Sequence, residues 1–126
     1  MNELRTQIQT ALSAITTIDV GAAIPDSLVQ EGITYFSYEL EERYVSEDFN
    51  KQNVMQVIFT GRIVRRESSS ENTLLIIDEA LEKIKKVLKD LNFDYSYHDV
   101  SAFTDGFKKI AVEGSTRYYE ANKTLI

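Results

Sequence analysis

Five carboxylates lie close together near the middle of the chain and are the first candidates for chemistry: Glu39, Glu41, Glu42, Glu47 and Asp48. A hard cation such as Ca²⁺ needs convergent oxygen ligands, usually from a compact loop with a glycine turn. Glu39 and Glu41 fall on one face of an expected strand, Glu42 falls on the other, and no such loop surrounds them. The pattern favours a solvated strand face over a metal site. We therefore expect no metal, no cofactor and no catalytic carboxylate pair.

The chain has a single histidine, His98, beside Asp99. An imidazole next to a carboxylate could act as a general base, but no serine is marked as a nucleophile by a glycine-flanked turn. The sequence has no cysteine, which excludes disulfides and thiolate chemistry. Its five glycines form no phosphate-binding cluster. We interpret His98 as an ordinary strand residue and predict that the protein is not an enzyme.

Arg62, Arg65 and Arg66 form the densest arginine group. They could contact DNA phosphates, or pair with the carboxylates across a hairpin or a subunit boundary. If the chain turns between residues 48 and 53, Glu39 lies opposite Arg62 and Leu40 lies opposite Gly61. Such a pair contributes roughly 0.2–1 kcal/mol. The net charge of −6 argues against nucleic acid as the main ligand.

The pattern of apolar residues along the chain predicts an α+β fold in a single domain, residues 1–126. Apolar residues at helical spacing predict helices over residues 3–16 and 71–91, with Ser69 or Ser70 as the N-cap of the second. Alternation predicts four strands, over residues 33–48, 54–66, 95–102 and 107–119. The order helix, strand, strand, helix, strand, strand predicts an antiparallel sheet with both helices packed on one face. No apolar run reaches the roughly 18 residues of a membrane-spanning helix, so we expect no membrane contact.

The first strand, "ITYFSYELEERYVSED", is long for so small a chain. Sixteen extended residues span roughly 53 Å, whereas a compact domain of this size is about 36 Å across. The strand therefore bends, or it projects with its partner as a two-stranded arm, or the two strands each contain a bulge, near Glu41 or Gly61, and fold onto the same body. An isolated hairpin is marginally stable in water, so an arm predicts a neighbouring subunit.

Three segments carry a resemblance to a known family: "IPDSLVQEGITYFSYELEERYVSED", "MQVIFTGRIVRRE" and "FTDGFKKIAVEGSTRYY". With the long helix between them, they resemble the tail terminator, or tail-to-head joining, proteins of long-tailed bacteriophages. The resemblance implies a non-enzymatic virion protein, assembled in the host cytoplasm as a homohexameric ring. That ring contacts the tail tube protein and the head connector, and DNA passes through it without specific binding.

On this basis we predict which residues form a subunit interface or line a channel. The acidic ones would keep the lumen from binding phosphate. The set is Glu39, Glu41, Glu42, Tyr44, Glu47, Asp48, Arg62, Arg65 and Arg66.

Two alternatives stay open. The first is another component of the head–tail neck, which the residues do not separate from a terminator. The second, of a different class, is a small dimeric α+β module that binds a ligand or acts as a regulator.

Overall fold

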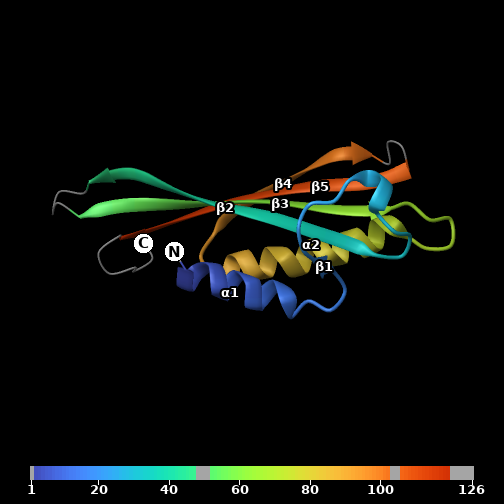
Figure 1. The fold of residues 1–126 in the computed structure, drawn as a ribbon, viewed down its shortest axis with the longest axis horizontal. Helices are drawn as coiled ribbons and strands as arrows, with labels where there is room; N and C mark the ends of the chain where they lie inside the picture. The colour runs from blue at the N-terminus through green and yellow to red at the C-terminus, as the bar shows by residue number, and fades with distance from the viewer. Residues whose placement is uncertain (1, 48–51, 103–105, 120–126) are drawn as a thin grey trace.

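Five strands form one mixed sheet in the computed structural model, and two α-helices lie on the same side of it (Figure 1). The structure describes residues 2–47, 52–102 and 106–119, without the side chains of residues 2 and 98–102. The elements are α1 (Asn2–Ser13), β1 (Asp19–Val20), the 3-10 helix η1 (Asp26–Leu28), β2 (Thr34–Glu47), β3 (Asn53–Arg66), α2 (Thr73–Asp90), β4 (Asp94–Ala102) and β5 (Phe107–Tyr119). The chain is therefore α+β, as predicted.

The strands follow the order β1-β2-β3-β5-β4, and the four long strands pair antiparallel. The prediction of a purely antiparallel sheet is wrong, because β1 pairs parallel with the start of β2. The backbone N–H of Gly21 donates to the carbonyl of Phe36 at 3.0 Å and ends this short ladder. Two residues carry too little alternation to be recognised as a strand in the sequence.

The helix α2 is amphipathic, and its buried stripe packs on the sheet through Ile77, Leu81, Ile84 and Leu88. Its N-cap is Asn72, whose side chain accepts a hydrogen bond from the backbone of Leu75 at 3.2 Å. The prediction of Ser69 or Ser70 as the cap is therefore wrong by two or three residues. An asparagine at this position satisfies a backbone donor that the first helical turn leaves unpaired.

The helix-covered face of the sheet holds a row of stacked aromatic rings. Tyr38 stacks on Phe59 with ring centroids 5.4 Å apart, and Phe36 stacks on Phe59 at 6.1 Å. Gly61 lies between them in β3, where a Cβ atom would come within 2.6 Å of the Phe36 ring. The pairing of β2 with β3 stays regular at Gly61, and its one irregularity falls between Tyr44 and Ser46. The strand thus contains a bulge, but at neither of the two expected positions.

The register of the β2–β3 hairpin differs from the expected one by two residues. Glu39 lies opposite Thr60, and Leu40 lies opposite Phe59. One residue of the difference arises at the turn, since Glu47 lies opposite Asn53, and the other arises at the bulge. The predicted cross-strand pair of Glu39 with Arg62 is therefore wrong.

The segment after β1 crosses to the face of the sheet that the helices leave open, so that η1 lies on the opposite side from α1 and α2 (Figure 1). Lys109 on β5 holds it by an ion pair with Asp26 at 2.7 Å. This segment covers one end of the open face, near the start of β2.

Candidate assembly interface

The hairpin of β2 and β3 extends beyond both helices at one end of the molecule (Figure 1). We call residues 40–47 and 53–59 the arm. Residues 41–44 are exposed, and Tyr44 retains 59% of its accessible surface. The end of β5 runs alongside β3 as far as the pair of Val54 with Tyr119. The arm therefore continues a three-stranded sheet, and the two-stranded ribbon expected from the sequence is corrected. A third strand makes the arm less dependent on a neighbour for its folding.

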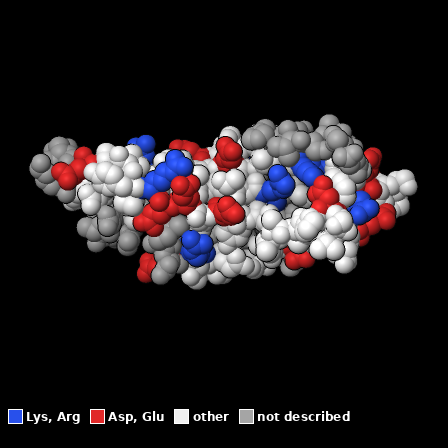
Figure 2. Space-filling view, turned by 45° about the horizontal axis from the view of Figure 1, so that its top comes forward, with Lys and Arg blue, Asp and Glu red and all other residues white. Residues whose placement is uncertain are grey.

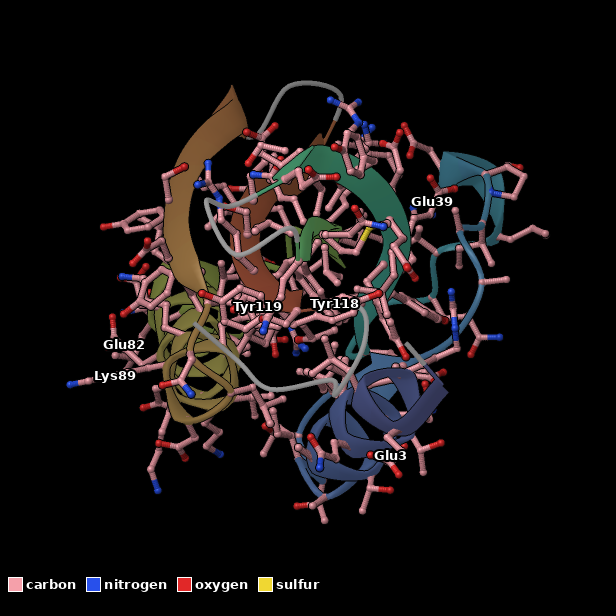
Figure 3. All side chains as sticks on the ribbon, turned by 90° about the vertical axis from the view of Figure 1, so that its left-hand side faces the viewer. Glu3, Glu39, Glu82, Lys89, Tyr118 and Tyr119 are labelled. Carbon is pink, nitrogen blue, oxygen red and sulfur yellow. The ribbon has the colours of Figure 1, made fainter. Side chains whose placement is uncertain are left out.

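On the open face of β2, Glu39 and Glu41 are exposed. Glu41 forms a bidentate ion pair with Arg43, whose Nε and Nη2 donate to the carboxylate at 3.0 and 3.2 Å. Both side chains are 58% exposed. The hydrogen bond to Glu41 and the charge of that carboxylate raise the pKa of Arg43. Figure 3, a view along the arm, shows Glu39 at the rim of the molecule.

Glu42 and Tyr44 lie on the other face of β2, the one that the helices cover nearer the centre of the sheet. The hydroxyl of Tyr118 on β5 donates a hydrogen bond to Glu42, so this contact reaches across β3. Glu47 is exposed at the end of β2. Asp48 lies outside the described residues.

The three arginines of the predicted interface have different surroundings. Arg62 is exposed on the open face and has no ion pair within the part of the chain that the structure describes. It lines a hollow of about 230 Å³ together with Asp19, Asp26 and Tyr35. Of the three, Arg62 alone is available to a partner in this way.

Arg65 is 5% exposed and faces the helix side of the sheet. Its Nε and Nη2 donate to Glu71 at 3.0 and 2.7 Å, and its Nη1 donates to the hydroxyl of Thr34 at 2.6 Å. The hydrogen bond from Arg65 lowers the pKa of Glu71. Arg65 thus links β2, β3 and the turn before α2. These guanidinium donors therefore bond within the chain itself.

Arg66 is likewise engaged within the chain. Its Nε and Nη2 donate to the backbone carbonyl of Val29 at 3.1 and 3.0 Å. Its guanidinium lies over the ring of Phe107, 5.1 Å from the centroid. Arg66 therefore holds the segment that crosses to the open face.

Charges of both signs alternate on the side of the molecule shown in Figure 2, where blue and red groups lie next to one another among uncharged residues. On this side the carboxylates do not form an uninterrupted acidic surface. Among the described residues, no three acidic or histidine side chains gather as a metal site would require.

Two tyrosines that hold the arm and the edge of the sheet were not among the predicted site residues. Tyr118 bonds Glu42, and the hydroxyl of Tyr38 donates to Gln9 on α1 at 2.5 Å. Burial raises the pKa of Tyr38, and the charge of Arg5 opposes this shift. The alternation of β5 places Tyr118 on the same face as Glu42, but only the strand order reveals that β3 lies between them.

The sequence matches no model of a known protein family, and it matches no curated protein either. No helix in the described part of the chain is long and apolar enough to span a membrane.

Proposed function

We propose that the protein is a structural component of a bacteriophage tail, a tail terminator that closes the tail tube and provides the tail-side surface for head joining. It acts as a homo-oligomeric ring, most simply a hexamer, whose partners are the tail tube protein and the head connector. It performs no chemistry and carries no cofactor. The family resemblance of the three sequence segments is the source of this assignment.

The observation that supports assembly is the arm. A three-stranded extension with residues 41–44 exposed and Tyr44 at 59% exposure has no evident role in a monomer. Exposed aromatic and arginine side chains on such an extension suit a protein interface, where both residue types are enriched. Tyr44 and Arg62 are the exposed aromatic and arginine members of the predicted set.

The surroundings of the arginines lead us to assign fewer residues to the interface or channel than the sequence predicts. Arg65 and Arg66 serve the chain itself, so we assign the interface to the arm and to Arg62. Glu39 and Glu47 are exposed carboxylates that could border a lumen through which DNA passes.

Binding to tail proteins, read by electron microscopy, tests this proposal. The free protein is mixed with a phage tail tube protein, and the mixture is imaged by negative stain. A ring at the tube end supports the proposal. Binding to the head connector alone would point to another neck component, and binding to neither would contradict a role in the tail.

A further inference from the structure

One edge of the sheet is open along the arm. The carbonyl of Phe36 accepts a hydrogen bond from the backbone N–H of Gly21, directly after β1, so the backbone polar groups of Phe36 face away from β3. In an antiparallel strand every second residue faces the same way. The backbone N–H and C=O of Leu40, Glu42 and Tyr44 therefore also face outward. β1 ends at Val20, and within the described residues no strand pairs with the outer edge of this part of β2, the edge that faces away from β3.

We propose that the free protein forms a two-fold dimer in which the β2 edges of two copies pair antiparallel through residues 40–44. Glu42 lies on the two-fold axis and faces its own counterpart. Glu41 of each copy then lies opposite Arg43 of the other. Leu40 of each copy lies opposite Tyr44 of the other.

Charge complementarity selects this register. The two Glu41–Arg43 pairs between copies join the Glu41–Arg43 pairs that exist within each copy, making a network of two carboxylates and two guanidinium groups. The facing Glu42 side chains would repel each other, but each is held by the hydroxyl of Tyr118, two strands away from the open edge. That hydrogen bond draws the carboxylate toward the sheet.

The limits of the open edge also fit five residues. The bulge between Tyr44 and Ser46 interrupts regular pairing at one end. At the other end, the backbone N–H of Gly21 is bonded to the carbonyl of Phe36, so the chain after β1 still covers the edge of the strand there. A partner strand therefore has room to pair between these two points.

The other outer strand of the sheet is a poorer partner for β2. β4 contains Asp94 and Asp99 but no lysine or arginine, so Glu39 and Glu41 would meet no fixed positive charge there. Pairing of β2 with a second β2 supplies Arg43 instead. This inference does not depend on the phage role, because the pairing of one β2 edge with a second β2 edge joins two copies only, whereas a ring is built from head-to-tail contacts.

Charge reversal tests the proposed pairs. Sedimentation velocity of the wild-type protein should show a dimer of the 14.4 kDa chain. Glu41→Lys and Arg43→Glu each turn the two intermolecular pairs into like-charge pairs, and each should weaken the dimer by at least about tenfold. The double variant Glu41→Lys/Arg43→Glu should restore it. Glu113→Lys, an equal charge change on an exposed residue of β5, should have no effect.

Cysteine cross-linking reads the register. The chain has no cysteine, so each introduced thiol is unique. Residues 41 and 43 would oppose each other as a non-hydrogen-bonded pair with Cα atoms about 4.5 Å apart, within disulfide range. Oxidation of a mixture of Glu41→Cys and size-tagged Arg43→Cys should give the mixed dimer. Either variant alone should cross-link poorly.

Three results would overturn the proposal. The first is a wild-type protein that stays monomeric or forms only larger rings. The second is a dimer that both charge reversals leave intact. The third is efficient cross-linking of Glu41→Cys with itself, which would place a different residue on the axis.

Discussion

The hydroxyl of Tyr118 on β5 donates a hydrogen bond to the carboxylate of Glu42 on β2, with β3 lying between the two strands. Tyr118 is 3% exposed, whereas Glu42 belongs to the exposed part of β2. The contact therefore links β2, the edge strand of the arm, to β5, which lies two strands away.

Removing this hydroxyl should loosen the arm. We expect Tyr118→Phe to lower the free energy of unfolding by about 1 kcal/mol, because the ring stays buried while the hydrogen bond is lost. Urea denaturation followed by circular dichroism measures the change. Tyr119→Phe is the matched control, since Tyr119 is the next residue of β5 and successive side chains of a strand point to opposite faces (both are labelled in Figure 3). Equal effects of the two substitutions would assign no special role to the Tyr118 bond.

Gly61 is a test of aromatic packing. Its place in β3 leaves no room for a Cβ, which would lie 2.6 Å from the Phe36 ring and 3.0 Å from Phe59. We expect Gly61→Ala to destabilise the fold by about 1–3 kcal/mol, the usual cost of overpacking a core. The urea midpoint checks this expectation.

Two further variants test whether the contact with the Phe36 ring causes the loss of stability in Gly61→Ala. Gly21→Ala should leave stability unchanged, because no atom lies within 4 Å of the added Cβ. Phe36→Leu should reduce the cost of Gly61→Ala, because the smaller side chain makes space. A loss in Gly61→Ala that Phe36→Leu does not reduce would point away from the ring contact.

The sequence predicts the long elements of this fold well, because each carries its own periodicity. The stripe of Ile77, Leu81, Ile84 and Leu88 defines α2 to within two residues at its start and one at its end. The register of the hairpin depends instead on one turn and one bulge, and neither has a strong residue signature. An error of a single residue at each was enough to assign Glu39 the wrong partner.

The different roles of Arg62 and Arg65 could not be predicted from the sequence either, but for another reason. Arg65 and Arg62 lie three residues apart in β3 and so point to opposite faces. The sequence does not say that Thr34 and Glu71 come within hydrogen-bonding distance of Arg65, since these contacts depend on where the turn before α2 crosses the sheet.

This difference between the arginines leads to a matched pair of substitutions. Arg65→Met should lower the free energy of unfolding by about 2–4 kcal/mol, because it leaves the hydroxyl of buried Thr34 without its donor and removes both bonds to Glu71. Arg62→Met, on the exposed face, should change it by less than about 0.5 kcal/mol. Thermal and urea unfolding of both variants measure this contrast. Similar stabilities would mean that the Arg65 network contributes little.

The same network predicts a pH dependence. The pKa of Glu71 is lowered in the folded state from its ordinary value of 4.5, mainly by the hydrogen bond from Arg65. Its contribution to stability is therefore complete above 4.5 and is lost as the pH falls through the lowered folded-state pKa. Urea midpoints of the wild type and Glu71→Gln should differ at neutral pH and converge in acid. A difference that stays constant across this range would contradict the assignment.

Shortening the arm separates folding from assembly. Arg43 lies opposite Gln56, so replacing residues 44–55 by Asn-Gly closes the hairpin with a two-residue turn that suits antiparallel strands. We expect the variant to fold, since the cluster around Phe36, Phe59 and α2 remains, with some loss of stability where Met55 and Val54 are removed. Circular dichroism checks the fold, and analytical ultracentrifugation with and without the tail tube protein checks assembly. A control in which only residues 46–53 are replaced by a glycine-serine turn keeps the exposed edge at residues 40–44. Since the arm is our candidate interface, the shorter variant should fail to assemble, whereas this control should still assemble. Normal assembly of both variants would show that the arm is not part of the interface.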